Sequence, residues 1–413
     1  MKKFSYLICT LMALVSIALV GCEKKENQDE TVAPLKLSAA EKQARDVTND
    51  YSFSFLKAVY ADNVEKQGDK NCVVSPLSAA MVLAMLENGA NGDTRTQILE
   101  TLGFKANQEN DMNNFYHRMM VELPTRTSYA EVIISNSVWA KNGLEVKEEY
   151  KNALNKHFMA STKNYDFTDP KTADIINSWC ANNTKNHITK IVEADEIIDA
   201  SMVLINALYF KNDWAAQFDA EKTKDGVFYA EDKEYNMDFM HREGTYRTMK
   251  NGTYLMLEMD YKGGAYCMDF ILPNGSNKVA DVVESLDATA FENVLEQLAS
   301  TNIDVAIPRL KISSNYILND ALIAIGIQNA FDIEKADFSK ISTDPLFVSL
   351  VKQKTFIELN EKGAEAAAVT GGMTTGATAP GAETFYVDRP FVLILRERQS
   401  NIILFAGVIV LPE

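Results

Sequence analysis

Histidine and cysteine, on which many catalytic and metal sites depend, are scarce in this chain of 413 residues. The four histidines, His117, His157, His187 and His241, are isolated, with no cysteine or second histidine at metal-ligand spacing. No Gly-x-Ser-x-Gly elbow, phosphate-binding glycine loop or His-Glu-x-x-His motif occurs. These absences predict a protein that is not an enzyme and that needs neither a metal nor another cofactor.

Of the five cysteines, Cys9 and Cys22 lie in the first 22 residues. The other three, Cys72, Cys180 and Cys267, are widely spaced and odd in number, which is a poor basis for a disulfide framework. We therefore expect three buried thiols that pack as small apolar side chains.

Positive charge is in deficit, because 41 lysines and arginines face 57 aspartates and glutamates, for a formal net charge of −16. Such a surface disfavours nucleic acid and anionic membranes and favours encounter with basic partners. The composition, 46% hydrophobic and 24% charged, is otherwise that of an ordinary globular protein. No linker interrupts residues 40–360, which favours one large domain over two.

The first residues have the features of a targeting segment. Lys2 and Lys3 precede an apolar run over residues 7–20 that is too short and too early to span a membrane comfortably. The run ends in Leu-Val-Gly-Cys at Cys22, which resembles the lipobox of bacterial lipoproteins. The resemblance implies that residues 1–21 are a signal peptide and that Cys22 is lipidated. An ordinary signal peptide with an incidental Cys22 is the alternative.

A lipidated Cys22 would attach the protein to the bacterial cell envelope through lipid alone, and the expected place is the outer membrane, on its periplasmic face or the cell surface. Residues 22–38 are polar and without periodicity, which predicts a flexible tether. The remaining residues, 39–413, are predicted to form the folded domain.

Regular elements do not alternate along this domain. A capping box at Ser38 and Glu41 predicts one helix start, and Ser75 followed by Pro76 predicts another, with Gly89 at its end. Two later helices are predicted within 287–300 and 315–326. Strands are predicted at 131–139, 202–210, 255–259, 266–272, 303–307, 348–359 and 402–411. This order favours an α+β fold over a doubly wound parallel sheet.

Residues 363–384 differ from the rest of the domain, because they are rich in alanine, glycine and threonine and contain no aromatic residue. A loop of this length inside a compact domain is usually functional or disordered. Strand-like sequence precedes and follows it.

The segments on either side of this loop carry a resemblance. Phe385-Tyr-Val-Asp-Arg-Pro-Phe391 is similar to the signature of the serpin family of serine protease inhibitors, and Asn360-Glu-Lys-Gly-Ala-Glu-Ala-Ala-Ala368 is similar to the hinge before the reactive loop of its inhibitory members. Further motifs match in the family's order over roughly residues 40–413, among them Ser75-Pro-Leu-Ser78 and Asn206-Ala-Leu-Tyr-Phe-Lys211 with Trp214.

The resemblance implies a three-sheet body surrounded by about eight or nine helices, with an exposed reactive centre loop at about 361–384. It also implies a suicide-substrate mechanism, in which a target serine protease cleaves the loop and the freed end inserts as a new strand into the largest sheet. A monomer is expected.

The family's functional positions carry over to the following residues of this chain. The hinge is Glu361, Gly363, Ala364, Glu365, Ala366, Ala367 and Ala368. The shutter beneath the sheet opening is Ser75, Ser78, Asn206 and Gln353, where glutamine replaces a frequent histidine, and the breach residue is Trp214. Glutamine both donates and accepts hydrogen bonds, so the shutter contact is expected to persist.

The loop sequence itself suits insertion. Alternate residues of a strand face opposite sides of the sheet. From Ala364 to Gly376, one face carries only alanine, threonine and glycine, and the charge of Glu365 is on the other. About fourteen residues would extend roughly 45 Å as a strand.

The resemblance implies a scissile bond at Ala377–Thr378, because the scissile residue of the family commonly lies sixteen positions after the hinge glutamate, here Glu361. Thr375 and Met373 are alternatives. A count back from the signature points to Ala379, but the following proline disfavours cleavage there. A small residue suits an elastase-like pocket rather than a trypsin-like one. A cysteine protease is a second candidate target.

Two competing interpretations stay open. One is a non-inhibitory serpin-like binding or chaperone module on the cell surface, and the other is an unrelated surface hydrolase.

Overall fold

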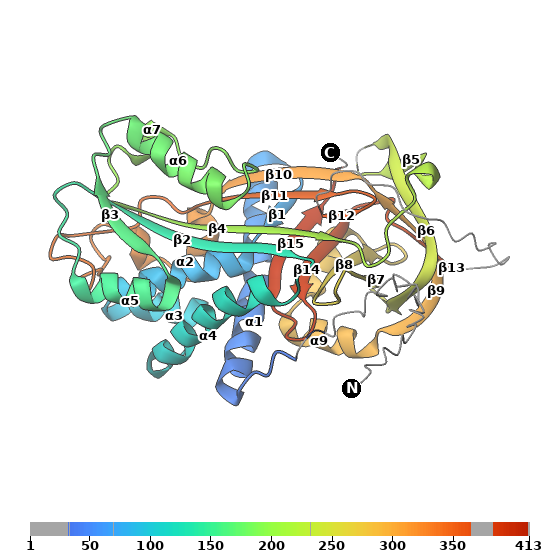
Figure 1. The fold of residues 1–413 in the computed structure, drawn as a ribbon, viewed down its shortest axis with the longest axis horizontal. Coiled ribbons are helices and arrows are strands. Elements are labelled where there is room, and N and C mark those ends of the chain that lie inside the picture. Colours follow the sequence, from blue (N-terminus) through green and yellow to red (C-terminus); the bar gives the residue numbers. More distant parts are fainter. Residues whose placement is uncertain (1–31, 33, 69, 232, 365–382, 412–413) are drawn as a thin grey trace, which may run out of the picture. The chain divides into compact units, whose positions relative to one another are not determined.

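The computed structural model describes residues 32, 34–68, 70–231, 233–364 and 383–411. Within these residues the fold is α+β, as predicted, with helices packed on and around two hydrogen-bonded sheets (Figure 1). The helices are α1 (Ala39–Gln67), α2 (Pro76–Gly89), α3 (Gly92–Thr101), α4 (Glu109–Glu122), α5 (Glu148–Phe158), α6 (Lys171–Asn183), α7 (Ala194–Ile197), α8 (Val279–Ser285), α9 (Ala288–Gln297) and α10 (Asn319–Ala324).

The strands are β1 (Cys72–Val74), β2 (Glu131–Lys141), β3 (Ser161–Tyr165), β4 (Met202–Asp213), β5 (Lys224–Tyr229), β6 (Glu234–Lys250), β7 (Tyr254–Asp260), β8 (Tyr266–Pro273), β9 (Ala299–Pro308), β10 (Leu310–Ile317), β11 (Lys352–Leu359), β12 (Gly363–Ala364), β13 (Glu383–Tyr386), β14 (Phe391–Glu397) and β15 (Ile403–Ile409).

The two predicted helix starts are confirmed. The Ser38 hydroxyl accepts from the Glu41 N–H, and the Glu41 carboxylate accepts from the Ser38 N–H at 2.7 Å, which completes the capping box of α1. Ser75 caps α2 in the same way, accepting from the Ser78 N–H, and Pro76 takes the first helical position, where its missing N–H costs nothing.

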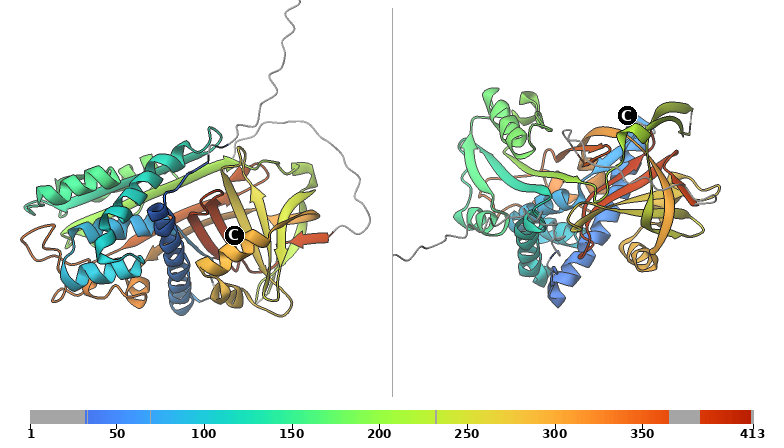
Figure 2. Two further views of the ribbon diagram at one scale, coloured as in Figure 1. Left: turned by 90° about the horizontal axis from the view of Figure 1, so that it is seen from below. Right: turned by 45° about the vertical axis from the view of Figure 1, so that its right-hand side comes forward.

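The six-stranded sheet has the order β10-β11-β12-β4-β2-β3. Its long members run antiparallel, β10 against β11 and β2 against β4, while β3 lies parallel to β2. Helix α6 covers one face of the sheet and α2 the other (Figures 1 and 2). The face towards α6 has its own small hydrophobic cluster around Trp139 and Ile176.

The nine-stranded sheet has the order β1-β15-β14-β8-β7-β6-β9-β13, with β5 paired to β6. Strand β6 is 17 residues long and joins two parts of the sheet, because its last residues pair with β7 while β9 follows most of its length. The second and third sheets of the predicted three-sheet body therefore share one strand and form a continuous hydrogen-bonded network.

Three predicted elements have different bounds. The strand predicted from 348 begins at Lys352, and the helix predicted over 287–300 ends at Gln297. The helix predicted over 315–326 is only α10, since residues up to Ile317 belong to β10. Strand β10 alternates strictly between buried and exposed side chains, a period of two that the sequence shows and that overrides the helical interpretation.

The last residues of the predicted tether lie against the folded domain. Leu35 is buried, and its N–H donates to the Gln399 side chain at 2.9 Å. The Lys36 carbonyl accepts from Arg118 at 3.1 Å. The domain therefore includes chain before residue 39, because an apolar side chain removed from water stabilises this attachment.

The three cysteines of the body, Cys72, Cys180 and Cys267, are free and buried, as predicted. Burial raises the pKa of the Cys72 and Cys180 thiols to about 12, so both stay protonated and unreactive at neutral pH. No helix of the described residues is both long and apolar enough to cross a bilayer.

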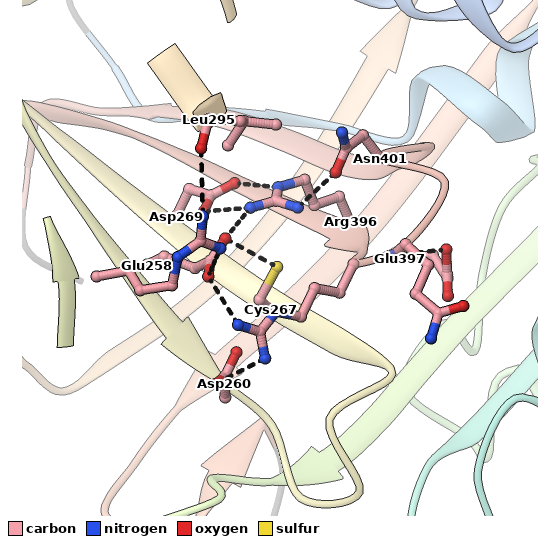
Figure 3. A network of polar contacts seen from close by, with 11 residues as sticks. Glu258, Asp260, Cys267, Asp269, Leu295, Arg396, Glu397 and Asn401 are labelled. Carbon is pink, nitrogen blue, oxygen red and sulfur yellow. Dashed lines mark hydrogen bonds and ion pairs between the residues drawn. The ribbon is translucent and has the colours of Figure 1, made fainter. Parts of the chain in front are cut away.

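A buried ion network joins β7, β8 and β14 in the nine-stranded sheet (Figure 3). Arg396 is 1% exposed and donates to Asp269 at 2.7 Å and to Glu258, both fully or almost fully buried. Its Nη1 donates to the Asn401 side-chain oxygen at 2.8 Å. Glu258, Asp269 and the Cys267 thiol surround the guanidinium, and burial raises the pKa of Asp269 to about 6 in spite of the cation.

This network generates a prediction. Arg396→Met should lower the free energy of unfolding by about 3–5 kcal/mol, because it leaves the buried Asp269 carboxylate without its cation. Glu258, in contrast, keeps its ion pair with Arg247. The measurement is the shift in the urea unfolding curve of the native protein. Lys335→Met removes an exposed ion pair with Asp332 and should cost no more than about 1 kcal/mol. Equal costs for the two variants would contradict the assignment.

Candidate functional site

The candidate site is a seam in the six-stranded sheet between β4 and β11. Within the described part of the chain, the two strands are joined through β12, where Ala364 pairs with Leu359 of β11 and with Asn212 of β4. Beyond this point, the edges of both strands that face the seam have no partner strand among the described residues. Unpaired backbone edges of this kind can accept an added strand.

The chain after β11 turns sharply back into the sheet at Asn360. The Asn360 side-chain oxygen accepts from the N–H groups of Lys362 and Gly363, at 3.1 and 3.3 Å. Trp214, which is 1% exposed, donates its indole N–H to the Asn360 carbonyl at 3.0 Å and its backbone N–H to the Lys362 carbonyl. The ring stacks on Tyr261 with centroids 4.4 Å apart. The predicted breach residue therefore holds the hinge turn directly.

Glu361 fastens the hinge to the other sheet. Its carboxylate accepts from Arg309 Nε at 2.8 Å and from the Thr223 hydroxyl at 2.6 Å, and Arg309 also pairs with Asp238 of β6. Burial alone would raise the pKa of Glu361, but the hydrogen bonds from Arg309 and Thr223 outweigh it and lower the pKa below the ordinary value of 4.5.

Gly363 and Ala364 have small side chains because neighbouring atoms fill the space around them. A Cβ added at Gly363 would clash with the Asn212 carbonyl and with the Asp213 backbone, so no larger residue fits there without displacing β4. Ala364 is 4% exposed and belongs to the main hydrophobic core. The hinge thus enters the sheet as a two-residue strand.

Beneath the seam, Gln353 binds the start of α2 through both ends of its amide. Its oxygen accepts from the Ser75 N–H at 2.9 Å, and its nitrogen donates to the Ser75 carbonyl at 2.8 Å. The Ser75 hydroxyl in turn donates to the Leu404 carbonyl of β15 at 2.8 Å. The expectation that glutamine can both donate and accept here agrees with this geometry, and Ser75, Ser78 and Gln353 lie together.

Asn206, the fourth predicted shutter residue, makes other bonds. It lies on β4, and its amide donates to Asn136 at 2.7 Å and contacts Met81 of α2. Its side-chain oxygen is buried and has no hydrogen-bond partner among the described residues. Asn206 therefore lies outside the hydrogen bonds that join Gln353, Ser75 and Ser78, and its amide bonds its neighbour on β2 instead.

A cavity lies in the seam below Ala364. It is lined on the core side by Leu208, Phe210, Ile357 and Leu395 among others, and on the side of α6 by His187, Tyr209 and Phe356. A strand entering below Ala364 would meet apolar walls and little free volume. Small uncharged side chains suit this space. The alternate loop residues from Ala364 to Gly376 are of this kind, since they are only alanine, threonine and glycine.

Several predicted site residues lie outside the described residues: Cys22, Glu365, Ala366, Ala367, Ala368, Met373, Thr375, Ala377 and Thr378. The segment 365–382 connects β12 in one sheet to β13 in the other. The roles of these residues stay predictions.

The sequence interpretation missed the partners that hold the predicted residues. Arg309 and Thr223 bind Glu361, and Asn136 binds Asn206. Thr355, two residues after Gln353 on the same face of β11, donates to the Val73 carbonyl of β1 at 2.7 Å. Only Thr355 had a local signal, its even spacing from Gln353; the others are ordinary polar residues brought together by distant chain segments.

Comparisons with known proteins give one family. The model described as Serpin (serine protease inhibitor) matches residues 46–412. Human neuroserpin is 30% identical over 357 residues, covering 84% of this chain and 87% of that protein. An uncharacterized serpin-like protein of Methanosarcina mazei is 29% identical and covers 100% of this chain and 98% of its own length.

Solved structures agree with these matches. The native state of the thermophilic serpin tengpin has a TM-score of 0.82 at 26% identity, covering 92% of this chain and 96% of that one. Human thyroxine-binding globulin, solved in complex with thyroxine, has a TM-score of 0.82 at 28% identity, covering 91% and 100%.

The Glu361 contacts generate a pH prediction. Since the folded-state pKa is lowered, the carboxylate stabilises the hinge above about pH 4.5, and this stabilisation is lost as the pH falls through the lower folded pKa. Glu361→Gln should melt below wild type at pH 7, and the difference should shrink as the pH falls towards about 3. Melting curves across pH test this. Glu358→Gln, which breaks a looser pair with Lys311, is the control and should change little.

Proposed function

The chain belongs to the serpin family, and from that premise we propose that it inhibits serine endopeptidases as a suicide substrate. Serpins are mostly protease inhibitors rather than enzymes, and their general partners are target proteases. The proposal is that a protease cleaves the loop after about Ala377 and that the freed end inserts between β4 and β11. The unpaired edges of these two strands, directly below Ala364, are the observation that carries the proposal.

The chemistry belongs to the protease. Its serine oxygen attacks the carbonyl carbon of the scissile residue, the peptide bond breaks, and the new amine leaves with a proton from the protease histidine. The inhibitor is then joined to the protease as an ester at the end of the loop arm. Insertion of the arm would carry this ester along the seam before water can hydrolyse it.

Completion of the sheet is the proposed driving force for insertion. Each inserted residue can exchange backbone bonds to water for bonds to β4 or β11, and a typical intramolecular hydrogen bond contributes about 0.5–1.5 kcal/mol net. These bonds and the burial of the small side chains together have to exceed the cost of ordering the arm, which is about 1–2 kcal/mol per residue. The hinge is already in place to begin this process, since Ala364 pairs with both neighbours.

The proposed target class follows from the loop sequence. Alanine and threonine at the candidate cleavage positions fill a shallow pocket, so an elastase-like serine protease is the proposed target and a cysteine protease a second one. The acidic character of the chain would favour a basic protease. A monomer without a cofactor suffices for this mechanism.

The test is incubation with an elastase-like protease, with SDS-stable complex and loop cleavage as readouts. Wild type should form the complex and be cut near residue 377. Ala368→Arg places a charge on the face that must enter the core, so it should be cleaved as a plain substrate with about a hundredfold less complex. Glu365→Arg is the matched control, because it places the same charge on the opposite face, at a position that already carries a charged side chain, and it should still inhibit.

Complete turnover of wild type without complex would contradict inhibition. A non-inhibitory binding module, a role consistent with the ligand complex of thyroxine-binding globulin, would then be the better proposal. Two equally impaired variants would contradict the alternation on which the insertion argument depends.

We further propose that Cys22 is lipidated and anchors the domain to the bacterial envelope, at the outer membrane on its periplasmic face or the cell surface. The lipobox-like sequence before Cys22 supports this. Cys22→Ser should move the protein from the membrane pellet to the soluble fraction without changing its melting temperature, as measured by fractionation and labelling with a radioactive fatty acid. Retention in the membrane fraction and unchanged labelling would contradict the anchor.

A further inference from the structure

The seam between β4 and β11 is bridged by a chain segment that lies on the face of the sheet towards α6. This cover segment, residues 187–196, follows α6 and runs into α7. It is fixed to α6 by Asn177, whose side-chain oxygen accepts from the N–H groups of Ile191 and Val192 at 2.7 and 3.0 Å, and whose amide donates to the Val192 carbonyl at 2.9 Å.

On the β4 side, the cover segment is part of a packed block. Ile188, Ile191 and Val192 share one hydrophobic cluster with Ile176 of α6 and Ile205 of β4. The buried cluster and the Asn177 hydrogen bonds hold the segment to β4 and α6 together.

On the β11 side, three successive outward-facing residues meet the cover segment. Lys352 Nζ pairs with both carboxylate oxygens of Glu196 at 2.7 and 2.9 Å. Lys354 Nζ donates to the Lys190 carbonyl at 3.3 Å. The Phe356 ring stacks on His187 with centroids 4.6 Å apart. Residues 352, 354 and 356 share one face because side chains alternate along a strand.

His187 lies over the seam itself. Its ring stacks on Phe356 of β11 and also on Tyr209 of β4, at 4.6 and 5.7 Å between centroids. All three rings line the cavity below Ala364. The imidazole therefore bridges the two strands at the place where a strand following Ala364 would enter.

A strand added in the seam would widen the separation between β4 and β11 by about one strand spacing, roughly 4.8 Å. The cover segment stays with β4 because of its buried anchors. Its contacts to β11, an ion pair of 2.7 Å and a ring stack of 4.6 Å, cannot span such a displacement and must break first.

From this geometry we propose that His187, Glu196, Lys352 and Phe356 form a clasp that sets the rate at which the seam opens. The inference rests on the proposed insertion mechanism and adds to it the residues that control its speed. The clasp keeps the sheet closed before cleavage, and its release is a step of insertion. These are positioning residues, since their proposed role is to hold the seam closed and not to act on the bond that is cut.

The test uses an acetylated synthetic peptide with the sequence of residues 364–377 as the entering strand, so that no protease is needed. Uptake is followed by native gel shift and by the gain in melting temperature. Lys352→Ala and His187→Ala should each take up the peptide about fivefold faster than wild type, the equivalent of losing one partly exposed ion pair or ring stack. The charge swap Glu196→Lys with Lys352→Glu should return the rate to within about twofold of wild type.

Glu131→Gln is the matched control. It breaks an ion pair with Lys185, just before the cover segment, but Glu131 belongs to β2 on the same side of the seam as β4. Its uptake rate should equal that of wild type, because no contact across the seam is lost.

The outcomes separate the two proposals. Uptake by all variants at one rate overturns the clasp and leaves insertion intact, as does a charge swap as fast as Lys352→Ala. Uptake that is faster only in the clasp variants supports the clasp, even if wild type takes up no peptide. A peptide that enters no variant and stabilises none overturns the clasp and the insertion mechanism together.

Discussion

The six-stranded sheet depends on one constraint: among the residues that the structure describes, β4 and β11 have no backbone ladder between them except at the two residues of β12. A sheet normally gains its cohesion from such a ladder, and open edges invite a further strand. Across this seam, side-chain contacts take the place of the backbone ladder. The Glu361 contacts, the Gln353 bonds to Ser75 and the cover segment over His187 all hold chain segments around the same opening.

Side-chain contacts and a ladder differ in how they fail. A ladder of many bonds breaks cooperatively, whereas each side-chain contact contributes on the order of 1 kcal/mol and can break alone. A sheet closed in this way keeps two backbone edges to which an added strand could pair. Gly363 and Ala364 have to be small for a related reason. The chain enters the sheet at these residues directly beside the Asn212 backbone, which leaves no room for a larger side chain at Gly363.

Local patterns predicted local structure well. The capping box at Ser38, the Ser75 start of α2 and the α+β class follow from short-range chemistry and are confirmed. Long-range partners could not be predicted. Arg309 and His187 lie in sequence segments that match no motif, and only the fold brings them to Glu361 and Phe356. The strand predicted over 348–359 is present, but it begins at Lys352, because residues 348–351 have β-forming side chains and are not paired in the sheet.

The bonds of β11 indicate which half of the sheet can move. Thr355 donates to the Val73 carbonyl, and Gln353 holds Ser75, whose hydroxyl bonds the Leu404 carbonyl of β15. Strand β15 pairs with β14, which carries the buried Arg396 network, so β11 is fastened to the nine-stranded sheet. On the other side of the seam, the Asn206 amide donates to Asn136 of β2 and contacts Met81 of α2. Insertion would therefore displace β2, β3 and β4 with α6, and the clasp lies on the boundary where that displacement begins.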